Sequence, residues 1–404
     1  MPNPEVVTNY KDSDGVDLGK KLISKDYLIS VYPQIADQLI TPELWTWGHN
    51  ANGQLGDNTT TNKSTPVTTL AGGSNWKSVS GCGNQTAAIK TDGTLWTWGY
   101  NGYGQLGIND TTDRSTPVTT FAGGTNWKQV SGSGNQTAAI KTDGTLWTWG
   151  WNVSGQLGTN GGGNRLTPVT TFAGGTNWKQ VDCGTQTAAI KTDGTLWVWG
   201  YNIQGGLGTN DTTDRATPVT TFAGGTNWKQ VSCGYVHTAA IKNDGTLWTW
   251  GYNASGQLGT NDTTQRNTPV TTFAGGTNWK SASGSYYHTV AIKTDGTLWT
   301  WGYNSSGQLG TNDTTARLTP VTTFAGGTNW KQSAGSYYHT VAIKTDGTLW
   351  VWGYGGYGAL GTNDTTNRNT PVTTFAGGTN WKQVSDGSRN HTAAIKTSDD
   401  LIGI

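Results

Sequence analysis

Short apolar stretches that alternate with polar residues recur along most of the chain at one fixed interval. The dipeptide Leu-Trp places a tryptophan at positions 45, 96, 147, 197, 248, 299 and 350, in steps of 50 or 51 residues. A second series, Asn-Trp-Lys, places a tryptophan at 76, 127, 178, 228, 279, 330 and 381. A period near 50 residues with strand-like alternation is typical of β-propeller blades, because helical repeats would show apolar residues at helical spacing. The pattern therefore predicts seven similar β-sheet units.

Each repeat has room for four short strands, as the copy at residues 248–298 illustrates. A strand C at Leu247–Trp250 carries two tryptophans on one side, and an Asp-Gly turn, the strongest short hairpin signal, joins it to the preceding strand. A β-branched run that opens with proline suits an outer edge strand D. The strands that we predict for this copy are C at Leu247–Trp250, D at Pro269–Phe273, A at Trp279–Ser283 and B at Thr289–Lys293.

One four-stranded sheet cannot bury both of its faces, but seven sheets arranged radially can. The sequence therefore predicts an all-β fold, a seven-bladed β-propeller of ~51-residue repeats spanning residues 44–404, with a short amino-terminal arm at residues 1–43. The tryptophan pairs of the C strands should pack between blades. The first unit lacks its hairpin partner and the last unit supplies one, so we expect residues 391–397 to pair with residues 44–48.

Charge and cysteine content narrow the classes of partner. Charged residues make up 13% of the chain, the net charge is +1, and lysine and arginine recur evenly instead of clustering, which disfavours nucleic acid. No apolar run approaches the ~20 residues that span a bilayer, and the first residues show no apolar stretch of a secretory signal, so no membrane insertion is expected. Cys82, Cys183 and Cys233 fall at nearly equivalent repeat positions, which favours small half-buried side chains over a disulfide or metal site.

The repeat resembles a known family. The string WGYNASGQLG at residues 250–259, the following Pro-Val strand, and the later His288-Thr289 with Ala291-Ile292 resemble the repeat of the regulator of chromosome condensation, over residues 44–404. This resemblance implies a seven-bladed propeller that serves as a binding scaffold. The ultraviolet receptor of that family carries Gly-Trp-Arg-His-Thr, where this chain has Gly-Tyr-Val-His-Thr at 234–238, so the light-sensing activity does not carry over.

The amino-terminal arm has a resemblance of its own. Residues 17–45 are similar to short segments that precede propeller repeats in virion structural proteins of tailed phages, notably cyanophages. Within the arm, Ser24 is placed to cap a short helix over Lys25–Val31, and a second turn spans Gln34–Ile40. Two interpretations of the arm remain open, a plug for the propeller's opening and a docking segment for another virion subunit.

Differences between the repeats gather in two loops. In an antiparallel blade the A–B and C–D loops share one face, and here these loops vary while the B–C and D–A turns hardly change. The variation is either functional or neutral drift. The aromatic residues in these loops have two possible roles. They either cover the loops structurally, or offer rings that stack on sugars or dock on protein. The candidate binding residues are Tyr235, Tyr286, Tyr287, Tyr337, Tyr338, Arg389, Tyr100, Trp151, Tyr201, Tyr252, Tyr303 and Tyr354.

No catalytic, cofactor or metal site is predicted, because no repeat departs from the pattern with a set of chemical residues. The histidine position (237, 288, 339 and 391) holds glutamine in three repeats, which indicates structural hydrogen bonding and not metal binding. The loop aspartates (110, 211, 262, 313 and 364) offer one carboxylate each, too few for Ca²⁺, and suit loop capping with the arginine that follows.

The sequence thus favours a non-enzymatic structural and binding protein. The first hypothesis is a tailed-phage virion component, a decoration of the tail or capsid surface, whose arm binds other virion subunits and whose propeller contacts a host surface protein or glycan. It would reside in the extracellular particle. The alternative is a bacterial cytoplasmic protein-binding module resembling the β-lactamase-inhibitor propeller of the family.

Overall fold

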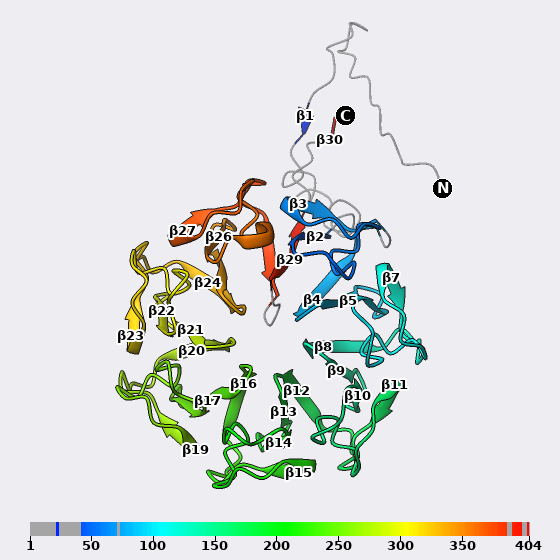
Figure 1. Ribbon diagram of the computed structural model, residues 1–404, viewed down its shortest axis with the longest axis vertical. Coiled ribbons are helices and arrows are strands. Elements are labelled where there is room, and N and C mark those ends of the chain that lie inside the picture. The colour runs from blue at the N-terminus through cyan, green and yellow to red at the C-terminus, as the bar shows by residue number, and fades with distance from the viewer. Residues whose placement is uncertain (1–21, 24–41, 71–72, 386–389, 398–401, 404) are drawn as a thin grey trace, which may run out of the picture.

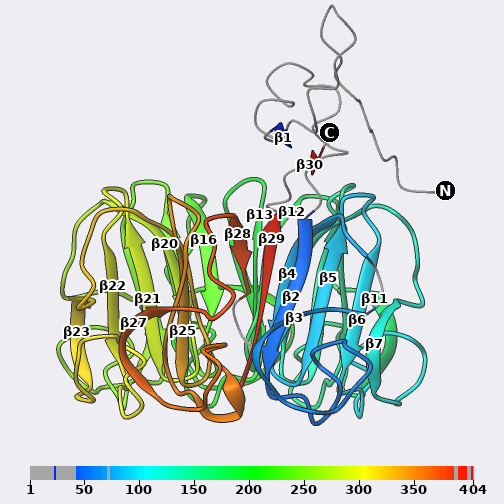
Figure 2. The ribbon, with the colours of Figure 1, turned by 90° about the horizontal axis from the view of Figure 1, so that it is seen from above.

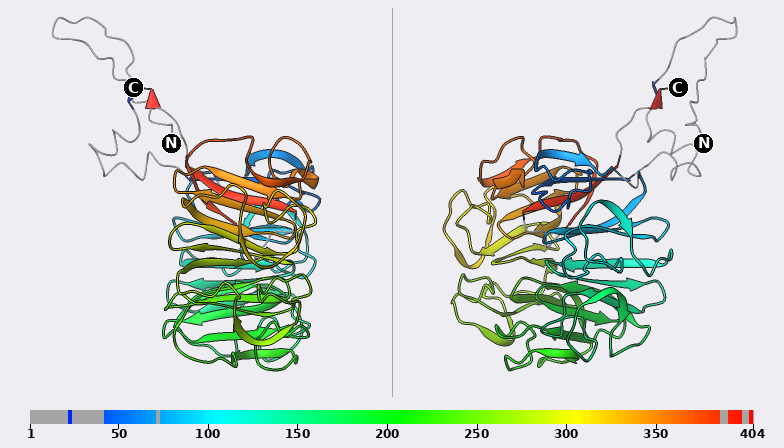
Figure 3. Two further views of the ribbon diagram at one scale, coloured as in Figure 1. Left: turned by 90° about the vertical axis from the view of Figure 1, so that its left-hand side faces the viewer. Right: turned by 45° about the vertical axis from the view of Figure 1, so that its right-hand side comes forward.

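The computed structural model describes residues 22–23, 42–70, 73–385, 390–397 and 402–403. Seven four-stranded antiparallel sheets stand around a central channel, which confirms the predicted all-β, seven-bladed propeller (Figure 1). Seen from the side, the sheets form the wall of a short cylinder with two broad faces (Figures 2 and 3). Among the described residues, the single helical element is a short 3-10 turn, η2 (Gly356–Gly358).

In every blade, strand A is innermost and strands B, C and D follow outward (Figure 1). Six blades are formed by consecutive strands: β4 (Trp76–Cys82), β5 (Gln85–Lys90), β6 (Leu95–Gly99) and β7 (Arg114–Thr119); β8 (Trp127–Ser133), β9 (Gln136–Lys141), β10 (Leu146–Gly150) and β11 (Arg165–Thr170); β12 (Trp178–Cys183), β13 (Gln186–Lys191), β14 (Leu196–Gly200) and β15 (Arg215–Thr220); β16 (Trp228–Cys233), β17 (His237–Lys242), β18 (Leu247–Gly251) and β19 (Arg266–Thr271); β20 (Trp279–Gly284), β21 (His288–Lys293), β22 (Leu298–Gly302) and β23 (Arg317–Thr322); β24 (Trp330–Gly335), β25 (His339–Lys344), β26 (Leu349–Gly353) and β27 (Arg368–Thr373). The closing blade consists of β28 (Trp381–Val384), β29 (His391–Thr397), β2 (Pro42–Gly48) and β3 (Lys63–Thr68), and outside the ring β1 (Leu22–Ile23) pairs with β30 (Ile402–Gly403).

The predicted strands A, B and C are present in the copy at residues 248–298, and the prediction for strand D was shifted. Strand D, β19, begins at Arg266 and ends at Thr271, whereas Pro269–Phe273 was expected. Arg266 lies opposite Gly251 across a bulge, and Thr271 lies opposite Trp248, near the start of strand C. Beyond that point the backbone N–H of Phe273 donates to the carbonyl of Gly259 in the C–D loop, and the ring is 66% exposed.

The ring closes by pairing the two ends of the propeller segment. Strand β29 pairs antiparallel with β2 over seven residues, from Pro42 opposite Thr397 to Gly48 opposite His391. The expected pairing of residues 391–397 with residues 44–48 is therefore observed, and it extends two residues further. Across the neighbouring interface, Trp47 Nε1 donates to the carbonyl of Ala359 at 3.0 Å. On its other side, Trp98 Nε1 of the next blade donates to the carbonyl of Gln54 at 2.9 Å, so the closing blade is joined to both of its neighbours.

Packing between blades has the same composition all around the ring. One face of each sheet presents alanine, isoleucine and leucine, and the next blade covers it with tryptophan from its strands A and C. Trp228 and Trp250, for example, lie in one buried cluster with Ile190 and Leu196 of the preceding blade. The inner indole of each C strand also donates to a carbonyl of the preceding blade, at 2.8–3.0 Å. The tryptophans therefore bury apolar area between blades and also join neighbouring blades by hydrogen bonds.

A buried polar belt also runs around the ring at the histidine and glutamine position. His237, His288, His339 and His391 place Nε2 at 2.9–3.0 Å from a threonine hydroxyl of the next blade, and Gln85, Gln136 and Gln186 place Nε2 at 2.9–3.1 Å from the same hydroxyl. Each threonine hydroxyl donates to a main-chain carbonyl at 2.8–3.0 Å, so it accepts from Nε2–H. Glutamine can replace histidine here because both side chains present an N–H to the threonine hydroxyl. This agrees with the structural hydrogen bonding that the sequence predicted at this position.

Candidate binding site on the loop face

The face that carries the A–B and C–D loops is called the loop face. The opposite face, where strand B ends and strand C starts, is called the terminal face. The two kinds of loop lie in contact, since the N–H of Tyr303 in a C–D loop donates to the carbonyl of Tyr287 in an A–B loop at 2.9 Å. Gly302, at the end of strand C, makes this contact possible. Its φ is 103°, and a Cβ there would lie 2.5 Å from the Tyr287 carbonyl oxygen.

Eight tyrosines from the loops join into one network, called the tyrosine cluster. Its members are Tyr235, Tyr252, Tyr286, Tyr287, Tyr303, Tyr337, Tyr338 and Tyr354. Tyr286 lies at its centre, with ring centroids 4.0 Å from Tyr235 and 3.8 Å from Tyr337. The A–B and C–D aromatic series, predicted as two separate sets, thus form one surface across three blades.

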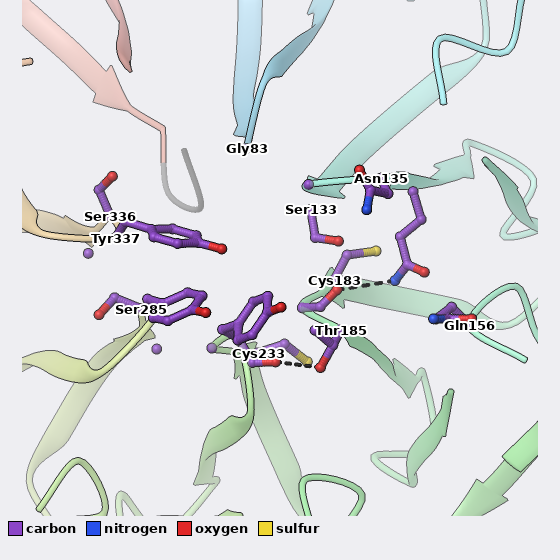
Figure 4. A pocket seen from close by; sticks show the side chains of 18 of the residues that line it. Gly83, Ser133, Asn135, Gln156, Cys183, Thr185, Cys233, Ser285, Ser336 and Tyr337 are labelled. Carbon is purple, nitrogen blue, oxygen red and sulfur yellow. Dashed lines mark hydrogen bonds between the residues drawn. The ribbon is translucent and has the colours of Figure 1, made fainter. Parts of the chain in front are cut away.

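The inner edge of the cluster borders a cavity of about 340 Å³ at the mouth of the central channel, called the loop-face cavity (Figure 4). Tyr235, Tyr286 and Tyr337 line one side of it, and the side chain of Tyr337 extends into the open space. Across the cavity the wall consists mainly of small polar residues, with Trp151 beside Asn135. The lining on that side includes Asn84, Ser133, Asn135, Gln136 and Thr185, together with main chain of several glycines.

The described lining of this cavity contains no lysine, arginine, aspartate or glutamate. Tyrosine is protonated at neutral pH and burial raises the pKa of Tyr286 further, so its hydroxyl serves as a neutral donor and acceptor. Cys183 and Cys233 also reach this wall, and burial raises the pKa of both thiols, which leaves them in the unreactive thiol form. The arrangement offers aromatic surface, amides and hydroxyls, a combination suited to an uncharged ligand with many hydroxyl or amide groups.

The remaining predicted binding residues lie apart from the tyrosine cluster or outside the described residues. Tyr100 and Trp151 both pack against Tyr103, at 6.0 and 6.2 Å between ring centroids, in a second, smaller group. Trp151 also lines the loop-face cavity. Tyr201 belongs to neither group within the part of the chain that the structure describes. Arg389 and the predicted helical turns of the arm lie outside the described residues.

Sequence reasoning missed the polar wall of the cavity and Tyr103. The A–B loop position of the lining tyrosines Tyr235, Tyr286 and Tyr337 holds glycine in three other blades, at 83, 134 and 184. Because every A–B loop ends at the same channel mouth, that exchange of tyrosine for glycine was the signal that could have indicated an asymmetric cavity.

Other candidate sites have structural explanations. The loop aspartates bind the arginine four residues later, with oxygen to nitrogen distances of 2.5–2.6 Å, in agreement with the predicted loop-capping role. The three cysteines are buried and no disulfide joins them. In the described ranges, no group of three or more histidine, cysteine, aspartate or glutamate side chains could hold a metal ion. Nor does any helix in those ranges have the length and apolar character to cross a bilayer.

The fold and the loop face together define a closed seven-bladed propeller with a channel-mouth cavity. Residues 121–403 match the model of the RCC1-like domain, and residues 43–89 and 92–140 match that of the regulator of chromosome condensation (RCC1) repeat. The chain belongs to the RCC1-like propeller family.

Known relatives agree with this assignment. The chain is 32% identical over 335 residues to the ultraviolet-B receptor UVR8 of Arabidopsis thaliana, covering 81% of this chain and 64% of the receptor. It is 27% identical over 369 residues to the mitochondrial RCC1 domain-containing protein RUG3 of the same plant, covering 84% of this chain and 72% of that protein. Among solved structures, yeast RCC1 (Prp20) bound to Kap60 superposes with a TM-score of 0.77 at 18% identity, over 98% of each chain. The matched region thus spans less than two thirds of the plant receptor's length.

Proposed function

We propose that this protein is a non-enzymatic binding protein whose loop-face cavity and tyrosine cluster hold an uncharged ligand. The observation that carries the proposal is the asymmetric cavity, which has stacked tyrosines on one side and asparagine, serine and threonine on the other. Pockets with an apolar wall and a few convergent polar groups are the usual form of a ligand site. The blades repeat closely, so this asymmetry is a property of the loops alone.

A neutral glycan fits the chemistry of the cavity best. Sugar rings present apolar C–H faces that pack on tyrosine, and hydroxyls that exchange hydrogen bonds with amides and phenols. A charged ligand would have to give up its hydration without an opposite charge, because the described lining contains none. We therefore assign the host-surface glycan, and not a charged protein patch, to the loop face.

The place of the protein is the finer part of the proposal. The resemblance of residues 17–45 to virion proteins supports a tailed-phage particle, with the propeller displayed and the arm bound to another virion subunit. The terminal face, where Pro42 pairs with Thr397, is the side from which such an arm would attach. The loop face then points away from the particle, toward a host surface.

A cytoplasmic bacterial protein-binding module is the second candidate, favoured by the family itself. The yeast relative was crystallised with Kap60, and the binding of Prp20p to Gsp1p and histones has been studied, so members of this family hold proteins. Mass spectrometry of purified phage particles separates the two candidates. We expect this chain at fixed stoichiometry in the particles, and its absence from them would favour the cytoplasmic module.

Ligand class is tested separately with the full chain on an array of neutral and anionic glycans. We expect retention of neutral glycans that changes little between low and high salt, because no ion pair contributes. Retention only of sulfated or sialylated glycans, lost at high salt, would contradict an uncharged cavity.

A further inference from the structure

The even spacing of lysines along the sequence was expected to disperse positive charge, and the fold does the opposite. In every blade a lysine is the second residue of strand A, one position after the tryptophan where that strand leaves the terminal face. These exposed residues are Lys77, Lys128, Lys179, Lys229, Lys280, Lys331 and Lys382. Because the seven A strands surround the channel, regular repetition places the seven lysines in a ring around its terminal-face opening, called the lysine ring.

A second set of lysines adds to the charge of the same face. Each strand B ends on the terminal face with a lysine whose Nζ lies 4.2–5.8 Å from the ring centroids of two tryptophans, as Lys242 does over Trp228 and Trp248. Against these fourteen lysines stand the six aspartates of the B–C turns and Glu43, an excess of seven positive charges on the described terminal face. The described part of the terminal face is therefore cationic, although the net charge of the whole chain is only +1.

Part of the lysine ring lines a concave site. Lys77, Lys128 and Lys382 come from three adjacent blades and border a cavity of about 520 Å³ on the terminal face. The same cavity is bordered by the polar Ser78, Thr91, Gln383 and Thr397 and by the apolar Pro42, Trp76 and Ile395. Within the described residues the ring lysines make no ion pair, whereas Lys63 on the loop face lies 3.3 Å from a carboxylate oxygen of Asp57. Three ammonium groups that border one concave site, with no carboxylate among its described lining residues, favour the binding of an anion.

We propose that this terminal-face cavity binds a compact polyanion, a small molecule that carries several phosphate groups. Lysine ammonium groups are well suited to phosphate oxygens, and the hydroxyl of the exposed Thr91 supplies a further donor. The cavity is concave and lies at the mouth of a closed ring, so it fits a compact anion better than an extended nucleic-acid backbone, which needs a continuous track. The site lies on the face opposite the tyrosine cluster and does not depend on the glycan proposal.

The test is isothermal titration calorimetry of the full chain with inorganic tripolyphosphate at about 0.15 M salt, where long-range attraction is screened. We expect saturable binding to the wild type. The triple variant K77Q/K128Q/K382Q should bind about thirtyfold more weakly, roughly threefold for each lysine lost. The matched variant K229Q/K280Q/K331Q removes three lysines from the opposite sector of the same ring and should change the affinity by less than about threefold.

Three results would overturn the proposal: no binding of tripolyphosphate to the wild type, equal losses in the two triple variants, or stronger binding of a DNA duplex that tripolyphosphate cannot displace. Equal losses would indicate attraction by the whole face without a site. Preference for the duplex would assign the face to nucleic acid. Circular dichroism of each variant confirms that lost binding does not reflect lost folding.

Discussion

The four buried histidines of the polar belt make a strong prediction about pH. Burial lowers the pKa of His237 to about 4 and the pKa values of His288, His339 and His391 each to about 3. In the unfolded chain a histidine takes up a proton near pH 6.5. The unfolded state therefore binds more protons than the native state between pH ~6.5 and ~4, and the stability of the native state falls as the pH falls through that window.

The size of this loss follows from the linkage relation. Each histidine costs about 1.4 kcal/mol of unfolding free energy for each pH unit below ~6.5, since its native form stays neutral. At pH 5 this amounts to roughly 2 kcal/mol for each histidine and roughly 8 kcal/mol for the four, an order-of-magnitude figure. Most single domains have a total stability of about 5–15 kcal/mol, so the effect is large enough to measure.

The matched perturbation is the quadruple variant H237Q/H288Q/H339Q/H391Q. Glutamine already occupies this position in three blades, where its Nε2 donates to the same threonine hydroxyl, so the belt can remain intact. The assay is the urea midpoint followed by tryptophan fluorescence at several pH values between about 7.5 and 5. We expect the wild-type midpoint to fall steeply and the variant midpoint to stay nearly level. Parallel curves for the two proteins would refute the assignment of buried, neutral histidines.

Three further perturbations test the packing. Deletion of residues 390–404 removes β29 and its pairing with β2, so the whole propeller should lose more than about 5 kcal/mol and aggregate, and an unchanged melting temperature would contradict ring closure. Trp250→Phe removes a donor to the Gly206 carbonyl, which keeps the hydroxyl of Thr238 as a donor, so we expect a loss of only about 2 kcal/mol in urea unfolding. Gly302→Ala should lower the free energy of unfolding by about 3 kcal/mol, because the new Cβ would meet the Tyr287 carbonyl. Gly275→Ala, where a Cβ would have nothing within 4 Å, should lower it by about 1 kcal/mol. Similar melting temperatures for the two variants would exclude a special role for Gly302.

Much of the fold could be predicted because the same strand and turn pattern occurs in all seven repeats. The interval between tryptophans indicated blades, the Asp-Gly turn placed strands B and C, and the unequal first and last units indicated how the ring closes. Strand D was shifted because its start depends on the bulge opposite Gly251, a tertiary feature that β-propensity does not record. The proline that was expected to begin the strand lies inside it.

The candidate sites were harder to predict because they depend on which residues converge around the channel. Tyr286 and Tyr337 are 51 residues apart in sequence, yet their rings lie 3.8 Å apart, since equivalent A–B loops meet at the channel mouth. The ring of lysines arises in the same way, and their regular spacing along the chain concealed it. In a closed repeat protein, a residue that is evenly spaced in sequence is gathered on one face in space.

The tyrosine cluster is the proposed binding surface of the loop face. The direct measurement is the attachment of the purified full chain to host cells, comparing wild type with Y286A/Y337A and with F324A, whose ring is 67% exposed outside the cluster. We predict that attachment falls at least about tenfold for the double variant, a loss of ~1.4 kcal/mol or more, and is unchanged for the phenylalanine variant. Undiminished attachment of a correctly folded Y286A/Y337A protein would contradict the assignment of the tyrosine cluster as a binding surface.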